Sequence, residues 1–444
     1  MSKAASRIAT LDLTPGDMCN LECEHCYAAS SKNGGHGDDR LMTEDEIRTV
    51  VQNLAECGVK TIDIAGGEPT LAYDRLLTAI EEFKFQVPDG YVGIVTNSTQ
   101  LDPERVDELK SAGLDAINLS FEGTTREVND SVRGEGHFRS ACAAASMVKE
   151  AGLHLGVSIT INAVNRSQAN QFVPFANRLD ADGLAFQVIE PRGRAPEYWD
   201  KLGLEITDGL ESLLLVFDRH TTMHLDIPGA YRYREFLNTY FNANIPLVDG
   251  QCPGGDRSYV VTSGGDLAPC PLHAYVLDEG TYSVADSSSN LDAITAEYLD
   301  FNAEIDSRGR ELVPCAGCEY NEECTHCPVN DDVVDECVWV NKKERELRQS
   351  ILKSSLTQKA PYTAVGGKLQ FDVPTQTTHL TVHLTESQFQ ELLSYDTAEE
   401  ILAADVLPLD DEEAIEFLCM LRSHGVIEIE KFWEPFTVTP PRLD

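Results

Sequence analysis

The sequence predicts an α/β fold in which helices flank a parallel sheet. Six apolar, strand-like runs recur at similar intervals through the first half of the chain, at residues 8–13, 61–65, 91–96, 116–120, 153–160 and 184–189. Helical patterns separate them, and Thr43 with Glu46 has the capping-box spacing at the start of one. Strands that alternate with helices imply right-handed βαβ units. Periodicity alone leaves open whether the sheet curves into a barrel or stays open and doubly wound.

Composition and charge narrow the class of protein. The 444 residues carry 35 Lys and Arg against 74 Asp and Glu, a net charge of -39. With 42% hydrophobic residues the chain is expected to fold. The excess negative charge repels phosphate backbones and anionic lipids, so neither nucleic acid nor a membrane is an expected partner. The 13 Lys beside 22 Arg favour a halophilic source, where salt screens an acidic surface. The alternative is an acidic protein from a mesophile.

The cysteine content points to metal binding. Residues 1–10 lack the pattern of a signal peptide, and no stretch of the sequence is long and apolar enough for a membrane span, so we expect a cytoplasmic protein. The chain holds 13 Cys, several in Cys-x2-Cys spacing. In a reducing compartment such spacings are typical of metal sites rather than disulfides.

The chain divides into three parts joined by one linker. We expect a first domain at 1–235, a loop-rich, cysteine-rich domain at 236–356, a linker at 357–368 and a small α+β unit at 369–444. In the small unit we expect strands at 369–373, 378–384 and 426–429. We expect its helices after Thr385, at 398–405 and at 411–424.

The first chemical motif is Cys19-x3-Cys23-x2-Cys26, directly after the first strand. Three thiolates at this spacing can hold three corners of a four-iron cluster and leave one iron open. Zinc with His25 as the fourth ligand is the alternative on spacing alone. With His25 before and Tyr27 after the last cysteine, the motif resembles the signature of the radical S-adenosylmethionine (SAM) superfamily. That resemblance implies a partial (β/α)6 TIM-like barrel with a catalytic [4Fe-4S] cluster.

The resemblance also implies contacts to SAM at the carboxyl ends of later strands, where parallel sheets place their sites. A Gly-Gly-Glu-Pro turn would let backbone approach the methionine amino group. An Asn would lie at the rim, a Ser would meet a ribose or carboxylate oxygen, and an Arg would pair with the methionine carboxylate. With His25, these cofactor-binding candidates are Gly66, Gly67, Glu68, Asn97, Ser120 and Arg133. Arg194, after the sixth strand, either lines the site or has a structural role.

The second cysteine set resembles the SPASM extension of the same superfamily, which binds two auxiliary [4Fe-4S] clusters. The resemblance implies one cluster on Cys252, Cys270 and Cys327, and another on Cys315, Cys318, Cys324 and Cys337. A two-zinc ribbon is the structural alternative. The first auxiliary cluster would lack a fourth thiolate. Asp256, Asp266 or His326, or else water or substrate, would fill that corner.

These resemblances imply an oxidoreductase or maturase that reductively cleaves SAM to a 5'-deoxyadenosyl radical and abstracts a hydrogen atom from its substrate. The expected substrate is a peptide or protein, because the small C-terminal unit weakly resembles PqqD-like peptide-recognition domains. A plain winged-helix-like scaffold is equally compatible. The alternative substrate is a tetrapyrrole that is decarboxylated in haem biosynthesis. The expected electron donor is a low-potential ferredoxin or flavodoxin. From another class, the chain could be a non-catalytic iron-sulfur carrier.

Overall fold

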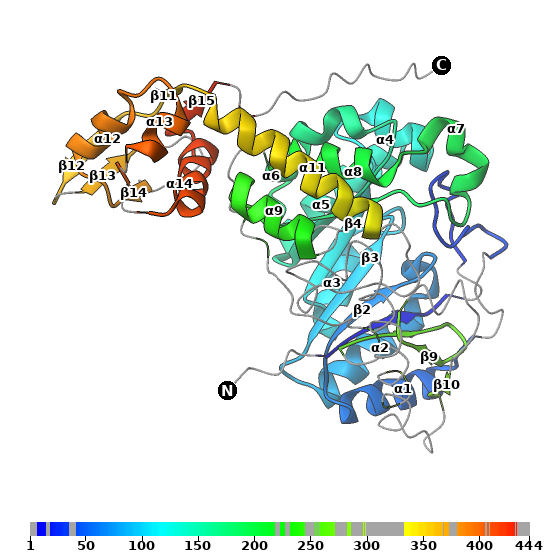
Figure 1. Ribbon diagram of the computed structural model, residues 1–444. Coiled ribbons are helices and arrows are strands. Elements are labelled where there is room, and N and C mark those ends of the chain that lie inside the picture. Colours follow the sequence, from blue (N-terminus) through cyan, green and yellow to red (C-terminus); the bar gives the residue numbers. More distant parts are fainter. Residues whose placement is uncertain are drawn as a thin grey trace.

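The structure is a computed structural model in which a curved sheet carries helices on its outer side and a small unit follows at the C-terminal end (Figure 1). It describes residues 7–14, 18–34, 41–217, 223–226, 231–243, 245, 254, 257–270, 282–285, 296, 298, 333–366, 368–372, 380–404, 406–407, 409–430 and 432. No helix within these ranges is long and apolar enough to cross a lipid bilayer.

Within the described residues, one ten-stranded sheet contains the strands between residues 7 and 283, in the order β10-β9-β8-β1-β2-β3-β4-β5-β6-β7. The strands are β1 (Arg7–Asp12), β2 (Val59–Ala65), β3 (Tyr91–Thr96), β4 (Ala116–Phe121), β5 (His154–Ile161), β6 (Gly183–Val188), β7 (His224–Asp226), β8 (Ser258–Val261), β9 (Asp266–Ala268) and β10 (Tyr282–Ser283). From β8 through β7 all neighbours are parallel, while β9 and β10 are antiparallel. The predicted α/β fold with a mostly parallel sheet is confirmed.

The sheet differs from the prediction at both ends. A seventh parallel strand, β7, follows the six expected ones. The cysteine-rich part, expected to be loop-rich, contributes β8 beside β1 and the hairpin partners β9 and β10. These strands have two to four residues each, too short for a periodic pattern to be recognised.

Helices follow the strands and cover the apolar side of the sheet. They are α1 (Glu44–Glu56), α2 (Tyr73–Gln86), α3 (Pro103–Ala112), α4 (Arg126–Arg133), α5 (His137–Ala151), α6 (Phe172–Arg178), α7 (Trp199–Leu202), α8 (Ile206–Leu214) and α9 (Tyr231–Phe241). The predicted capping box opens α1: Oγ1 of Thr43 accepts from the backbone N–H of Glu46, whose carboxylate accepts from the backbone N–H of Thr43.

Alternation along the strands separates an apolar face from a polar one. In β5, Leu155 and Val157 are fully buried, whereas Gly156 and Ser158, which alternate with them, are only half-buried. Because side chains of a strand point alternately to opposite faces, the buried set packs under the helices. The half-buried set lines the concave interior of the sheet.

A long helix, α11 (Val333–Leu352), packs against α8 and α9 and leads to the small C-terminal unit (Figure 1). In the part of that unit that the structure describes there are a two-stranded sheet, a three-stranded antiparallel sheet and three helices. The elements are β11 (Leu356–Gln358), β12 (Tyr362–Val365), β13 (Lys368–Phe371), β14 (Leu380–Val382), α12 (Glu386–Leu392), α13 (Ala398–Ala403), α14 (Asp411–Ser423) and β15 (Ile427–Ile429).

The segment 357–368 is not the linker that we expect from its Pro361 and Gly366. It holds most of β11 and all of β12. Packing explains the difference, since the Tyr362 ring lies 5.4 Å from the ring of Phe371 and 5.6 Å from that of Phe389. These aromatic contacts hold the segment in a strand, although its local composition favours a linker.

Candidate functional site

The three cysteines of the first motif lie together in the loop that follows β1. Cys19 and Cys23 are buried and Cys26 is half-buried. Burial raises the pKa of Cys19, and it raises the pKa of Cys23 to about 11. The negative charge of a thiolate at Cys26 would raise both pKa values further, so the three sulfurs are within electrostatic reach of one another. Thiols in this state bind iron only when the metal displaces their protons.

N–H groups already point at two of the sulfurs. The backbone N–H of Leu21 donates to Sγ of Cys19 at 3.4 Å, and that of Ser30 donates to Sγ of Cys26 at 3.3 Å. The side-chain amide of Asn97, a predicted site residue, also donates to Sγ of Cys19 at 3.5 Å. Hydrogen bonds to cysteine sulfur stabilise the ligating thiolate and tune the potential of an iron-sulfur cluster.

Arg194 holds the shape of the cysteine loop. Its Nη1 donates to the carbonyl of Cys23 at 2.7 Å, and its Nη2 donates to the carbonyls of Ala29 at 2.9 Å and Ser30 at 2.5 Å. Its backbone N–H donates to the carbonyl of Cys26 at 2.9 Å. The structure thus gives Arg194 the structural role that sequence reasoning left open.

Glycine is required directly before Arg194, whose hydrogen bonds to the cysteine loop act as a clamp. Gly193 has a φ of +57°, and a Cβ there would lie 2.2 Å from the carbonyl oxygens of Cys26 and Tyr27. Any larger residue would push the cysteine loop away from β6. Residues 193 and 194 therefore work together to fix the loop.

The Gly66-Gly67 turn lies against the end of β1. Gly66 has a φ of +111°, and a Cβ there would meet Oδ1 of Asp12 at 2.1 Å. The backbone N–H of Gly67 donates to Oγ1 of Thr14 at 3.1 Å. Close packing on β1 is thus one reason for glycine at position 66, and the backbone approach to SAM remains a prediction.

Glu68 ties this turn to the end of β3. Its fully buried carboxylate accepts from Oγ1 of Thr96 at 2.7 Å, from the backbone N–H of Asn97 at 2.7 Å and from the backbone N–H of Thr70 at 3.1 Å. Burial raises the pKa of Glu68, and these neutral donors only partly offset the effect. In the structure Glu68 therefore positions Asn97, which in turn contacts Cys19.

Glu122 is the central acid of the site, and sequence reasoning did not select it. Its side chain is fully buried at the end of β4, with Oε1 at 2.8 Å from Nη2 of Arg133 and 3.1 Å from Nε2 of His25. Oε2 accepts from the backbone N–H of Thr160 at 3.2 Å. Although burial raises it, His25 and Arg133 hold the pKa of Glu122 below its ordinary value. Its position two residues after Ser120, at a strand's carboxyl end, was the available signal.

The two basic residues on Glu122 still have unused hydrogen-bonding atoms. The side chains of His25 and Arg133 are 11% and 10% exposed. Nδ1 of His25 and Nε of Arg133 are buried and have no hydrogen-bond partner among the residues that the structure describes. Buried polar atoms are normally satisfied, so these atoms point to a missing ligand. A cluster on three gathered thiols with SAM beside Arg133 fits both observations.

The remaining predicted ligands are only partly placed. Ser120 is half-buried on the concave face of β4, in register with Ser158 of β5. Cys270 follows β9 and Cys337 lies in α11. Burial raises the pKa of Tyr27 to about 12, and the charge of a thiolate at Cys270 would raise it further. Cys270 is therefore within electrostatic reach of Tyr27, the residue after Cys26. Five other predicted ligands lie outside the described residues, namely Cys252, Cys315, Cys318, Cys324 and Cys327, as do Asp256 and His326.

A cysteine triplet at the carboxyl edge of a parallel α/β sheet, beside a buried cluster of Arg133, Glu122 and His25, fits an iron-sulfur site of the SAM-cleaving kind. Comparison with known families agrees. Residues 13–177 match the Radical SAM superfamily, so this part of the chain is a radical SAM domain.

Two kinds of curated relative are similar to this chain. The mycofactocin maturase MftC of Mycolicibacterium smegmatis is 30% identical over 187 residues, which cover 41% of this chain and 45% of that protein. The AdoMet-dependent heme synthase of Methanosarcina barkeri is 29% identical over 339 residues, which cover 73% of this chain and 91% of that protein. The chain thus matches less than half of the maturase but most of the heme synthase.

Solved structures share the fold. Native anSMEcpe with bound AdoMet superposes with a TM-score of 0.57 and 20% identity, covering 76% of this chain and 95% of that one. SuiB of Streptococcus suis bound to S-adenosylmethionine gives a TM-score of 0.55 and 18% identity, with 72% of each chain covered. At these identities the likeness supports the architecture alone.

Proposed function

We propose that this chain is a radical SAM iron-sulfur enzyme that cleaves SAM reductively and abstracts a hydrogen atom from a peptide or protein. The observation that carries the proposal is the set of three gathered thiols, held by Arg194 and flanked by the buried Arg133. A four-iron cluster and SAM would supply an electron and a 5'-deoxyadenosyl radical when bound there.

The chain's own residues would bind and orient these groups. Cys19, Cys23 and Cys26 would hold the cluster, with N–H donors on two of the sulfurs. Arg133 would pair with the methionine carboxylate through its unused Nε–H while Glu122 keeps the guanidinium in place. The other predicted SAM contacts are His25, Gly66, Gly67, Asn97 and Ser120.

Two further clusters on the seven SPASM-type cysteines complete the proposal. Anaerobically reconstituted protein should hold about 12 iron and 12 sulfide, the sum for three four-iron clusters. The proximity of Cys270 to Tyr27 supports an auxiliary cluster near the catalytic one. If the reconstituted protein, with its cysteines intact, holds only about four iron atoms per chain, the proposal of two auxiliary clusters is wrong.

Cys23→Ala is the direct test of the catalytic assignment. The variant should release no 5'-deoxyadenosine under dithionite, and it should keep the auxiliary clusters because the two ligand sets do not overlap. Cys142→Ala is the matched control, since Cys142 is a half-buried cysteine of α5 outside every predicted ligand set. If Cys23→Ala still releases 5'-deoxyadenosine, the assignment of the catalytic cluster is wrong.

Peptide or protein maturation is supported by the similarity to mycofactocin maturases. Two structural neighbours have also been solved with peptides, SuiB with the precursor SuiA and anSMEcpe with the Kp18Cys peptide. In the small C-terminal unit, β12 and β14 are the outer strands of the three-stranded sheet within the described residues. A leader peptide could add a strand to such an edge.

Tetrapyrrole decarboxylation in haem synthesis is the second candidate, because the heme synthase relative matches 73% of this chain. Anaerobic turnover with a propionate-bearing porphyrin separates the two. Loss of carbon dioxide from the porphyrin, followed by mass spectrometry, would favour the haem pathway. A mass change only in a peptide encoded beside this gene would favour maturation.

The cellular setting is part of the same proposal. A low-potential ferredoxin or flavodoxin would deliver the electron that SAM cleavage consumes. We place the enzyme in a salt-rich cytoplasm, which the net charge of -39 supports.

A further inference from the structure

A cavity of about 540 Å³ opens on the concave face of the sheet. It is lined by the first residues of several strands, such as Tyr91 of β3 and Ala116 of β4, and it reaches mid-strand positions such as Thr10 of β1 and Asn118 of β4. The cavity therefore occupies the amino-terminal half of the strands. The predicted SAM contacts lie at the opposite, carboxyl ends.

The space exists because the inner face carries very small side chains. Gly93, Gly156 and Gly183 lie on three of the strands that line the cavity, β3, β5 and β6. A Cβ on Gly93 would lie 2.7 Å from Oδ1 of Asp63, and one on Gly156 would lie 3.1 Å from Cγ of Asn118. Larger residues at these positions would crowd the polar groups that project into the cavity.

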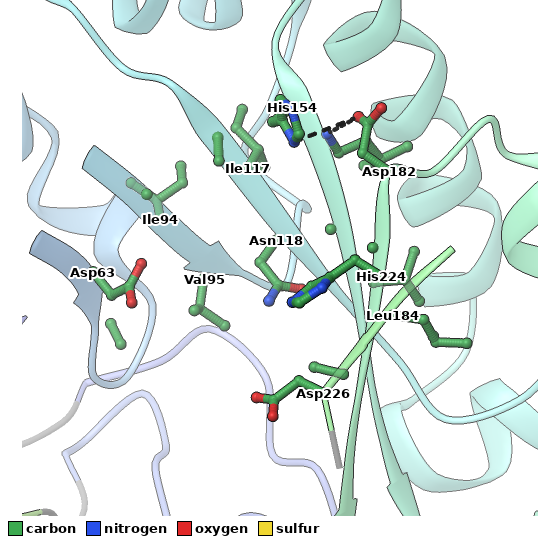
Figure 2. A pocket seen from close by; sticks show the side chains of 18 of the residues that line it. Asp63, Ile94, Val95, Ile117, Asn118, His154, Asp182, Leu184, His224 and Asp226 are labelled. Carbon is green, nitrogen blue, oxygen red and sulfur yellow. Dashed lines mark hydrogen bonds and ion pairs between the residues drawn. The ribbon is translucent and has the colours of Figure 1, made fainter. Parts of the chain in front are cut away.

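Those polar groups come from three strands. Asp63 projects from β2, Asn118 from β4, and His224 and Asp226 from β7, as Figure 2 shows. Oδ1 of Asn118 accepts from the Ser158 hydroxyl at 2.8 Å, which fixes the amide. With Asp182 and His154 at the rim, the lining combines three carboxylates with an amide and two imidazoles.

The charge of the cavity is negative. None of its lining residues is Lys or Arg, and within the described parts of the chain no ion pair joins Asp63 or Asp226 to a cation. Asp182 at the rim differs, because Nζ of Lys149 lies 2.9 Å from its Oδ2. Desolvation by burial raises the pKa of Asp63, as expected for a carboxylate without a cation beside it. An anionic ligand would be repelled here, and a cation would be attracted.

We propose that this cavity binds a cationic side chain, a guanidinium or an ammonium group, of the enzyme's peptide substrate. The inference rests on the proposed function and narrows its substrate class. A tetrapyrrole whose propionates carry negative charge would meet Asp63 and Asp226 instead of a cation, so the cavity favours the peptide over the porphyrin.

The geometry connects this cavity to the reaction site. Asn118 and Ser120 point to the same face of β4, two residues apart, which is roughly 7 Å along a strand. An extended Arg or Lys side chain spans a similar length. A substrate whose cationic end lies in the cavity at the depth of Asn118 would therefore hold its backbone near Ser120, on the side where SAM would bind. The cavity would fix the depth at which the substrate enters the sheet.

The test uses the full-length, reconstituted protein at fixed ionic strength, with L-arginine amide as the probe. Isothermal titration should detect saturable binding that is about tenfold or more tighter than that of L-citrulline amide, which has a similar shape but a neutral side chain. Asp63→Asn and Asp226→Asn should each weaken the arginine amide about tenfold. Asp89→Asn is the matched control, an acid on the surface with a side chain 85% exposed, and it should bind as the wild type does.

Equal affinity for both probes, or equal loss in Asp89→Asn, would overturn the proposal and leave only general attraction to an acidic chain. If Asp63→Asn does not fold, the comparison of the two probes on the wild type still decides. Release of 5'-deoxyadenosine by the wild type without a probe reports the proposed function separately. A wild type that releases it but does not discriminate between the probes refutes only the cationic pocket.

Discussion

Acidification should destabilise the fold through one buried imidazole at the start of α5. His137 is 3% exposed, and its Nδ1 lies 3.0 Å from Nδ2 of Asn129. Oδ1 of Asn129 accepts from the backbone N–H of Glu122, so its Nδ2 is a donor and Nδ1 of His137 must accept. If the ring were protonated, Nδ1 of His137 and Nδ2 of Asn129 would both be donors, and the hydrogen bond between them would be lost. Burial, reinforced by the charge of Arg133, lowers the pKa of His137 to about 3.

The sign and size of the effect follow from linkage. An unfolded histidine has a pKa of 6.5, so between that value and pH 3 the unfolded chain binds a proton that the folded chain excludes. Stability is therefore lost as the pH falls below 6.5. At pH 5 the loss from His137 alone is about 2 kcal/mol, from RT ln(1 + 10^1.5).

Urea unfolding at pH 7.5 and pH 5, at constant molar salt, measures this loss. Glu122 and Asp130, whose pKa values are lowered, also weaken the fold in acid, and Glu68, whose pKa is raised, acts in the opposite sense. The comparison is therefore between the wild type and His137→Gln, which share these carboxylates. The wild type should lose about 2 kcal/mol more than the variant over this interval. Equal losses would refute the assignment of a neutral, buried His137.

Three further predictions concern the site and the surface. Arg194→Lys should lower the iron bound by the first motif, because a lysine cannot satisfy three carbonyls as the planar guanidinium does. The control Arg192→Lys, at a nearby arginine that does not bind the cysteine loop, should retain the iron. Equal iron in the two variants would show that Arg194 does not hold the loop. Arg133→Ala should weaken SAM binding by roughly 1.5 to 3 kcal/mol in a titration, whereas unchanged affinity would show that Arg133 does not touch the cofactor. The melting temperature should rise from dilute buffer to molar salt as the charge of -39 is screened, and a flat profile would contradict a halophilic origin.

Much of the fold could be predicted because long strands and helices carry their own pattern. The six longer parallel strands and the capping box at Thr43 are in the sequence as alternation and as a local motif. The short strands β7, β9 and β10 carry no such pattern and form through pairing with neighbours. The same holds for β12, where Tyr362 is ordered by Phe371 and Phe389 rather than by its own neighbours in the chain.

The candidate site divides in the same way. The cysteine spacing and the Gly66-Gly67 turn are local, and both are recognisable in the order of the amino acids alone. The clamp is not, because Arg194 lies 171 residues from the Cys23 carbonyl that it binds. A single sequence contains no signal for such a contact, so Arg194 could be noticed but not assigned.

Glu68 and Glu122, two buried glutamates that follow β2 and β4, show how the surroundings of a side chain decide its charge. Glu68 is surrounded by neutral hydroxyl and N–H donors, and its pKa is raised by burial. Glu122 meets His25 and Arg133, and its pKa is lowered despite complete burial. Arg133 also lowers the pKa of Cys23, against the larger effect of burial. One guanidinium therefore stabilises both the Glu122 carboxylate and a thiolate at Cys23. Removing Glu122 should change the cysteine site even though, among the described residues, no hydrogen bond joins Glu122 to a sulfur.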